Sequence, residues 1–435
     1  MKIVMIIPGS GGGFYCENCL RDTGVVKVLR QRGHDATVVP LYLPMFTDDS
    51  DVAGDSPVFF GGVRLYLQHK IGWLRHMPRW MERLLDSSWI LGLAARQAGS
   101  TRARGMGAMT LSMIRGPDGS QAAELDRLIA WLERDGERPD VVQISSILLI
   151  GLAGQLRDRL KVPITCVLQD EDTWIDALDP PYDRVCWDAL AEQCSAVERF
   201  LPVSQFYASR MQAKLGLPAA KMTVVYPGIA TDDYVTAAPN PDPPVIGYLS
   251  KMTRALGLEI LVDAFVQLKK TRFPSLRLRA MGGQTGDDAR FLESLRRRLD
   301  DLGMAGDVEF LSGLDRESRI RFLTGLSVLS VPMPEGEAFG LFIIEALAAG
   351  VPVVQPDRGG FTEVVRMTGG GLLYDPAQPD ALVVALETML TDRAAAAAMG
   401  RQGQATVRQQ FSMNRMADDL LNIYKALPVA FRVTP

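Results

Sequence analysis

Two glutamates, Glu337 and Glu345, are the residues of this chain best placed to do chemistry. They enclose the short apolar run Ala338-Phe-Gly-Leu-Phe-Ile-Ile344, and the sequence stays apolar through Val354. Such a segment is hydrophobic enough to be buried, and carboxylates are rarely buried without polar partners. The pair therefore indicates a polar ligand between the two acids.

The element expected to position these acids is a helix that begins near Leu341, after a strand at 328–331 and a loop at 332–340. A helix N-terminus carries unpaired N–H groups and partial positive charge, so it suits a phosphate. Gly340 would let the backbone approach that ligand. Glu345, one turn further on, could accept hydrogen bonds from two vicinal hydroxyls, as on a ribose. The alternative is that Glu337 only complements the helix dipole and Glu345 is a surface acid.

A second glycine-rich turn, Gly9-Ser-Gly-Gly-Gly13, follows the first predicted strand. Such a turn before a helix can also contact a phosphate. A nicotinamide-binding loop is the competing interpretation. It is disfavoured because Phe14 stands where G-x-G-x-x-G needs its third glycine, and because Asp35 precedes the second strand instead of ending it.

Length and composition limit the class of protein. A chain of 435 residues predicts about two domains. A content of 47% hydrophobic and 23% charged residues is typical of a soluble globular protein, and a net charge of −4 does not favour nucleic acid as a partner. The apolar run at the N-terminus is too short for a signal segment, and we expect no membrane crossing. Five cysteines indicate reduced thiols and a cytoplasmic protein.

Apolar strand-like runs alternate with helical patterns along most of the chain, which predicts parallel sheets with crossover helices. The expected strands are 2–7, 36–40, 141–144, 163–168, 199–203, 222–225, 245–248, 277–281, 308–311, 328–331 and 353–355. The expected helices include 24–32, 148–160, 257–272, 288–302, 317–324 and 341–349. Four prolines within 237–244 predict the linker between the domains.

Residues 45–130 do not follow the alternation. Eight Arg or Lys and only two acids lie between Arg64 and Arg104, with Trp73, Trp80 and Trp89 among them. A basic segment with tryptophans can lie on an anionic membrane surface or contact an anionic acceptor. The simpler interpretation is an inserted helical subdomain with buried tryptophans and solvated arginines.

The segment from Glu337 to Glu345 resembles the E-x7-E motif of the family 4 glycosyltransferases. Further segments resemble the same family and extend the likeness over nearly the whole chain apart from 45–130. They are Gly33–Val39, Pro202–Ser204, Tyr226–Ile229, Val354–Val364 and Gly371–Pro376, the last as a turn.

This resemblance implies the GT-B fold, with two Rossmann-like parallel-sheet domains that face each other across a cleft. Residues 1–236 would form the acceptor-side domain with the insertion at about 45–130. Residues 237–244 would be the linker, and 245–410 the nucleotide-sugar-binding domain. Residues 411–435 would be a C-terminal helix that packs back on the first domain.

The resemblance also implies roles for single residues. Glu345 would hold the ribose of a nucleotide sugar, and Glu337 would lie beside the transferred sugar. The backbone of Phe339, Gly340 and Leu341 would face the diphosphate, as would Gly12 and Gly13. The implied activity is hexosyl transfer from a nucleoside diphosphate sugar, with retention, to a small molecule, lipid or glycan. A non-catalytic sugar-nucleotide-binding protein and a nucleotide-sugar epimerase remain as alternatives.

Two departures from the family pattern bear on catalysis. Lys251 stands at a position that is usually arginine, and Leu256 at one that is usually lysine, so Arg254 would have to supply the second positive charge. After the strand at 163–168, Gln169 and Asp170 stand where the family often has a histidine. Gln169 could bind a sugar hydroxyl, and Asp170 could orient or deprotonate an acceptor.

Metal and redox chemistry have weaker signals. The spacing Asp170-x-Asp172 resembles a metal-binding D-x-D, but enzymes of this fold generally need no metal, so none is expected. The alternative is a solvated acidic loop. Cys16 and Cys19 have C-x-x-C spacing without a second pair to complete a zinc site, so we expect them to pack the first helix.

Overall fold

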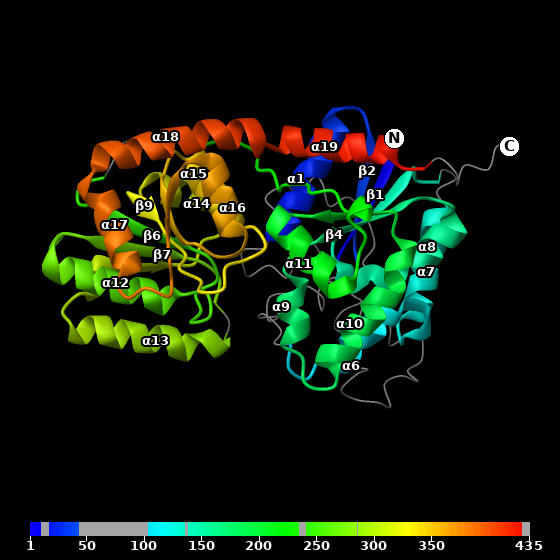
Figure 1. Cartoon of the computed structure of the whole chain (residues 1–435), viewed down its shortest axis with the longest axis horizontal. Coiled ribbons are helices and arrows are strands. Elements are labelled where there is room, and N and C mark those ends of the chain that lie inside the picture. Colours follow the sequence, from blue (N-terminus) through cyan, green and yellow to red (C-terminus); the bar gives the residue numbers. More distant parts are fainter. Residues whose placement is uncertain (10–16, 43–102, 135–137, 235–240, 285, 429–435) are drawn as a thin grey trace. The chain divides into compact units, whose positions relative to one another are not determined.

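The computed structural model describes residues 1–9, 17–42, 103–134, 138–234, 241–284 and 286–428. The chain divides into two compact units (Figure 1). Of the described residues, those up to Tyr226 and from Met416 onward form unit 1, and those from Pro227 to Arg415 form unit 2. The change of unit after Tyr226 precedes the linker predicted at 237–244, of which 237–240 lie outside the described residues. The tryptophan-bearing stretch at 64–102 also lies outside them.

Unit 1 contains a five-stranded parallel sheet in the order β2-β1-β3-β4-β5. Its core strands β3 and β4 are buried along their whole length, as parallel strands covered on both faces must be. The strands are β1 (Lys2–Ile7), β2 (Asp35–Pro40), β3 (Val141–Ile144), β4 (Ile164–Leu168) and β5 (Arg199–Pro202). All five strands agree with the predicted bounds to within one residue at each end, because short stretches rich in apolar residues mark them.

The helices of unit 1 come from both ends of the chain. They are α1 (Glu17–Gln31), α6 (Gly107–Arg115), α7 (Ala122–Arg134), α8 (Ala153–Leu160), α9 (Glu171–Asp176), α10 (Tyr182–Gln193), α11 (Gln205–Leu215) and most of α19 (Met413–Ala426). The Tyr424 hydroxyl of α19 donates to Gln143 Oε1 on β3 at 2.7 Å. Arg32 and Asp418 form an ion pair at 2.6 Å, so the last helix is tied to the sheet and to the segment after α1.

Unit 2 contains a six-stranded parallel sheet in the order β11-β10-β9-β6-β7-β8. The strands are β6 (Val245–Leu249), β7 (Arg277–Met281), β8 (Val308–Leu311), β9 (Val328–Leu329), β10 (Val353–Pro356) and β11 (Gly371–Tyr374). The helices are α12 (Leu258–Thr271), α13 (Gly286–Asp301), α14 (Arg316–Thr324), α15 (Leu341–Ala348), α16 (Gly359–Thr368), α17 (Ala381–Thr391) and α18 (Arg393–Gln410). Figure 1 shows α12 and α13 on one side of this sheet and α15 and α18 on the other.

Three predicted elements differ most from those observed. Residues 222–225 form only a single bridge, between Met222 and Phe200, instead of a strand. Thr223 and Val225 do donate to neighbouring carbonyls of β5, but Pro202 has no N–H to donate back, so the ladder is incomplete. Residues 371–374, expected to be a turn, form β11 beside β10. The first helix begins at Glu17 instead of Gly24, which lies inside it.

The strand order creates a switch point in each sheet. In unit 2 the chain leaves β6 toward β7 and β8, then returns to the other side of β6 as β9. In unit 1 the corresponding reversal lies between β1 and β3. Open parallel sheets bind ligands outside the carboxyl ends of the strands at such points. Within the described ranges no helix is both long and apolar enough to cross a membrane.

Candidate functional site

The loops that follow β6 and β9 meet at the switch point of unit 2. Gly257 ends the first loop with φ +81°. A Cβ there would lie 2.2 Å from the carbonyl oxygen of Pro332 in the second loop, so only glycine permits this contact. The contact brings together the loops that lead into α12 and α15, which begin at Leu258 and Leu341.

Glu345 lies in the middle of α15, a helix in which every residue is buried. Its carboxylate oxygen Oε1 accepts hydrogen bonds from Tyr234 Oη at 2.9 Å and from Arg319 Nε at 3.4 Å. Glu345 and Arg319 are 2% and 3% exposed, so Glu345 is not the surface acid of the alternative interpretation. Arg319 compensates the buried charge, and the two donors fix the carboxylate in one orientation.

Glu337 is half-buried in the turn before α15. Its carbonyl oxygen accepts the N–H of Gly360 at 2.7 Å, which joins the turn to the start of α16. Burial raises the pKa of Tyr248 well above its usual value, and the charge of Glu337 contributes to that rise. The Tyr248 hydroxyl donates to the carbonyl oxygens of Lys251 and Leu256, at 2.8 and 3.3 Å. Tyr248 therefore brings Glu337 and the basic loop into one neighbourhood.

Gly340 is the N-cap of α15 and has φ +89°. A Cβ at this position would lie 2.7 Å from the ring of Phe361, which itself packs edge-on against Phe342. Packing within unit 2 therefore demands the glycine, independently of the ligand approach that the sequence suggested.

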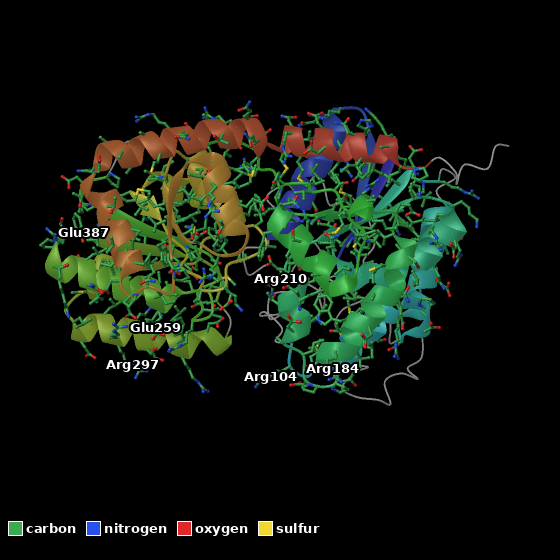
Figure 2. The ribbon with its side chains drawn as sticks, viewed as in Figure 1. Arg104, Arg184, Arg210, Glu259, Arg297 and Glu387 are labelled. Atoms are coloured by element: carbon green, nitrogen blue, oxygen red, sulfur yellow. The ribbon has the colours of Figure 1, made fainter. Side chains whose placement is uncertain are left out.

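The two cations predicted to neutralise a phosphate differ in their surroundings. Lys251 Nζ lies 3.7 Å from Asp288 and is half-buried. Arg254 is 69% exposed, lies over the Phe291 ring and pairs at 2.6 Å with Glu259, which is labelled in Figure 2. Its guanidinium is thus directed to the surfaces of α12 and α13, and the geometry favours Lys251 as the cation of this loop.

The predicted residues of unit 1 lie at the end of β4. Gln169 and Asp170 are half-buried, and Asp170 adopts φ +53°, an uncommon conformation for a non-glycine residue. The solvated acidic loop is not found, because the next two residues, Glu171 and Asp172, are 4% and 1% exposed.

Those two acids face inward and share Tyr207. The Tyr207 hydroxyl lies 3.2 Å from Glu171 Oε2 and 3.0 Å from Asp172 Oδ1. Asp172 also forms an ion pair with Arg210 (Figure 2). Burial raises the pKa of Glu171 to about 7, against the lowering effect of the N–H groups of Gln169 and Ile147. Asp172 is therefore engaged internally and does not form a D-x-D site with Asp170.

Several sequence predictions fall on residues that cannot be placed. Gly12, Gly13 and Cys16 lie within 10–16, outside the described residues. Cys19 is a buried free thiol. In the part of the chain that the structure describes, no group of three or more His, Cys, Asp or Glu could hold a metal ion.

The sequence did not point to Tyr234 or Arg319. Arg319 lies in the charged stretch Asp315–Arg321, which has the composition of an exposed helix, and Tyr234 stands just before the predicted linker. Their importance comes from contacts between distant segments. A Glu with no local cation, such as Glu345, is the only sequence signal that a remote partner is needed.

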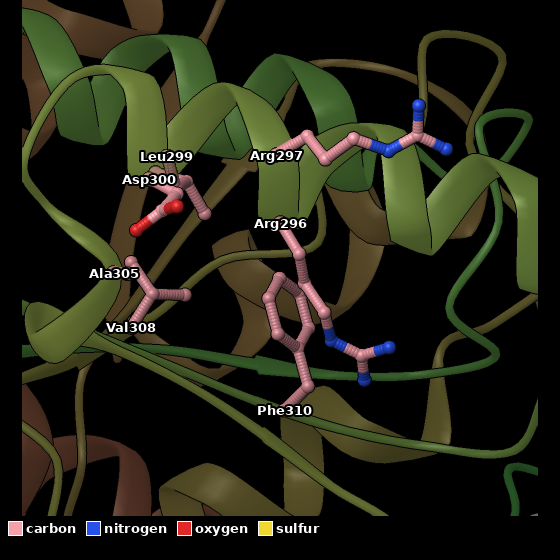
Figure 3. Close-up of a pocket in the computed structure, with 7 residues that line it drawn as sticks. All are labelled: Arg296, Arg297, Leu299, Asp300, Ala305, Val308 and Phe310. Atoms are coloured by element: carbon pink, nitrogen blue, oxygen red, sulfur yellow. The ribbon is translucent and has the colours of Figure 1, made fainter.

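A hollow of about 430 Å³ lies elsewhere on unit 2, between α13 and β8 (Figure 3). The Arg296 guanidinium lies 5.2 Å from the centre of the Phe310 ring in its wall. Because β8 is the edge strand, this hollow lies away from the switch point beside β6. It contains none of the residues described above.

Two family models cover most of the described chain. The model described as Glycosyltransferase Family 4 matches residues 111–233, and the model described as Glycosyl transferases group 1 matches 234–406. The chain belongs to the family 4 glycosyltransferases. The recognition made on the Glu337–Glu345 motif is thereby confirmed.

Curated relatives of this family 4 glycosyltransferase match parts of it. A GDP-mannose-dependent alpha-(1-6)-phosphatidylinositol monomannoside mannosyltransferase of Mycolicibacterium smegmatis is 31% identical over 46% of the chain and 55% of the relative. A D-inositol 3-phosphate glycosyltransferase of Jonesia denitrificans is 31% identical over 44% of the chain and 45% of the relative. The chain thus spans about half the length of the curated relatives it matches.

Solved structures resemble the family 4 glycosyltransferase over almost its full length. HepE of Anabaena in complex with UDP covers 98% of this chain and 100% of its own, with a TM-score of 0.67 and 18% identity. Sucrose-phosphate synthase of Thermosynechococcus elongatus covers 98% of both chains, with a TM-score of 0.68 and 17% identity. These likenesses confirm the fold class, with two parallel-sheet α/β domains of the GT-B type.

Proposed function

We propose that this chain transfers a hexose from a nucleoside diphosphate sugar to a hydroxyl group of an acceptor, with retention at the anomeric carbon. The observation that carries the proposal is Glu345. It is a buried carboxylate, held by Tyr234 and Arg319, at the carboxyl side of the switch point in unit 2. Family membership supports the same function, since curated relatives carry the names of a GDP-mannose-dependent mannosyltransferase and inositol phosphate glycosyltransferases.

In this proposal the donor lies outside the ends of β6 and β9. Glu345 accepts hydrogen bonds from the ribose hydroxyls, because a fixed carboxylate can accept from two vicinal groups. The N–H groups at the start of α15 face the diphosphate, and Lys251 turns from Asp288 toward it. Glu337, beside Tyr248, lies at the transferred sugar.

The bond between the sugar and the phosphate breaks through a state with oxocarbenium character, while negative charge grows on the departing phosphate. Fixed amides and Lys251 stabilise that charge without reorganising during the reaction. The departing phosphate takes the proton of the acceptor hydroxyl, so no pair of glycosidase-like carboxylates is required. We further propose that no metal ion takes part, since the leaving charge is met by these groups.

The acceptor is proposed to be a polyol or a glycolipid headgroup. This class follows from the inositol-containing acceptors in the names of the relatives. Gln169 and Asp170, at the end of β4, are the described polar groups of unit 1 proposed to contact the sugar or acceptor.

The test is donor turnover by the purified full chain. GDP-mannose and UDP-glucose are supplied with and without D-inositol 3-phosphate, in the presence of EDTA, and release of GDP or UDP is measured. The proposal expects release from at least one donor, and Glu337→Ala should reduce it by about a hundredfold or more. Binding of a donor with no turnover would replace this function by that of a sugar-nucleotide-binding protein.

A further inference from the structure

One face of the unit 1 sheet carries several polar side chains, and of these the proposed function uses only Gln169. Thr165 and Gln143 are register partners on β4 and β3, so their side chains lie on the same face. Alternation along the chain places Gln169, just beyond β4, on that face too. Tyr424 contacts Gln143 there, and Arg21 of α1 contacts Gln169. The polar groups on this face thus include Thr165 and Gln169, with the apolar Val167 between them on the same strand. We call the set Thr165, Gln143, Gln169, Tyr424 and Arg21 the polar stripe.

Arg21 is the charged member of this stripe and is almost completely buried. It is 2% exposed, and its partner Asp22 is 1% exposed. Its Nε and Nη2 atoms both lie 2.8 Å from Asp22 Oδ1. Burying such a pair gives little net stability, because desolvation offsets the attraction of the two charges. The pair therefore needs an explanation other than stability.

A contact of Arg21 with Gln169 suggests why the buried ion pair is present. Its Nη1 donates to the side-chain oxygen Oε1 of Gln169. A guanidinium has only donors, so it can bind the amide of Gln169 only through oxygen. The NH₂ end of that amide must then be the end that Arg21 does not hold. Gln169 as a whole is half-buried, so it is not sealed inside the unit.

The backbone of Gln169 is held by a different residue, Glu171. Glu171 Oε2 accepts the N–H of Gln169 at 2.5 Å, and Glu171 Oε1 accepts the N–H of Ile147 at 3.1 Å. Asp170 between them has φ +53°. Uncommon backbone conformations persist where the surroundings over-determine them. Both ends of Gln169 are thus held before any substrate arrives.

We propose that Arg21 is a positioning residue for the transfer reaction. It holds the amide of Gln169 so that the Nε2–H group donates a hydrogen bond to an oxygen of the sugar substrate. The inference rests on the proposed function, in which Gln169 contacts the sugar or acceptor. It explains how glutamine serves at this position, because a free amide would present oxygen and nitrogen about equally. Arg21 itself does not touch the substrate.

A double-mutant cycle tests this inference. Arg21→Met/Asp22→Leu replaces the ion pair by apolar residues of similar volume and leaves no uncompensated buried charge. It is combined with Gln169→Leu, and kcat and KM for GDP-mannose or UDP-glucose are measured by nucleotide release. The control is Arg157→Met/Asp158→Leu. It removes another ion pair between an Arg and the Asp that follows it in sequence, on α8.

If Arg21 acts through Gln169, Gln169→Leu and Arg21→Met/Asp22→Leu each lower kcat/KM by about tenfold to a hundredfold. The combined variant then loses no more than Gln169→Leu alone, because the residues form one unit. Losses that multiply, or normal kinetics of Arg21→Met/Asp22→Leu, would overturn the inference. Absence of turnover in the wild-type chain would instead overturn the proposed function, and this inference with it.

The variant Gln169→Glu separates loss of the Nε2–H donor from loss of folding stability. A glutamate can still accept from Arg21, but its other oxygen offers an acceptor where the amide offered a donor. The variant should keep the thermal stability of the wild type and lose as much kcat/KM as Gln169→Leu. Wild-type kinetics of Gln169→Glu would show that the Nε2–H donor is not used.

Discussion

At the scale of single residues, the buried acidic groups are held in place by hydrogen-bond donors from other segments. Glu345 has Arg319 and Tyr234, and Glu171 has N–H groups and Tyr207. The sequence predicted that Glu345 is buried near a ligand, because the run around it is apolar. It could not predict Arg319, which lies in a polar stretch and reaches Glu345 only through the fold. The alternative of a solvated acidic loop at this place is wrong, because Glu171 and Asp172 are buried.

The first prediction concerns the choice between two cations. Lys251→Met should lower kcat for donor turnover by about tenfold to a hundredfold, because the leaving phosphate loses a charge-assisted partner. Arg254→Met should change kcat less than about threefold, since its guanidinium is engaged by Glu259 and Phe291 at the surface. Steady-state kinetics of both variants decide the matter, and a larger loss for Arg254→Met would contradict this assignment.

The second prediction concerns pH. The pKa of Glu171 is raised to about 7 in the folded chain, from 4.5 ordinarily. The folded state therefore binds this proton more tightly than the unfolded state. The resulting stability is fully present below about pH 4.5 and is lost as pH rises through about 7, a loss of about 3 kcal/mol.

Urea unfolding of the wild type and Glu171→Gln measures this effect. The stability of Glu171→Gln relative to the wild type should improve by about 3 kcal/mol between pH 4.5 and pH 8. Glu293→Gln, on the exposed face of α13, is the control substitution. A difference between wild type and Glu171→Gln that does not change with pH would refute the buried ionisation.

At the scale of elements, the strands and the loops differ in how far sequence predicts them. β1, β3, β7 and β8 have the predicted bounds because short stretches rich in apolar residues specify them locally. The 222–225 strand fails because its pairing depends on Pro202, a residue of another segment. The contacts of Gly257 and Gly340 are with residues far away in the sequence. The sequence therefore indicates that the glycines are needed, but it does not predict their neighbours Pro332 and Phe361.

The third prediction concerns Gly340. Gly340→Ala must strain a backbone with φ +89° and displace the Phe361 ring, so it should destabilise unit 2 by about 2–4 kcal/mol. Gly303→Ala has φ +68° with open space around its Cβ and should cost about 1 kcal/mol, from backbone strain alone. Equal losses of unfolding free energy for the two variants would show that the Phe361 contact does not matter.

At the scale of the whole molecule, the last helix belongs with the first part of the chain. Residues from Met416 onward are grouped with unit 1, although unit 2 precedes them in sequence. Tyr424 donates to Gln143 on the buried strand β3. Sequence periodicity predicts helices but not this long-range pairing, which the resemblance to the family alone suggested.

The fourth prediction follows from that pairing. Tyr424→Phe leaves the side-chain oxygen of Gln143 without this donor and should destabilise unit 1 by about 1–3 kcal/mol. Hydrogen exchange should then show lower protection in β3 and unchanged protection in β10. Tyr374→Phe, in unit 2, is the matched control. Loss of protection in β10 caused by Tyr424→Phe would contradict the division into units.

The measurement that tests the account most directly is nucleotide binding by the full chain. Isothermal titration compares GDP and UDP, and the tighter ligand is then compared with its 2′-deoxy analogue. If Glu345 holds the ribose, the wild type prefers the ribonucleotide by about tenfold or more, because a charge-assisted hydrogen bond is lost in the analogue. Glu345→Gln should lose most of that preference, with thermal unfolding used to confirm that the variant is folded. A Glu345→Gln chain that binds and discriminates like the wild type would contradict the central claim.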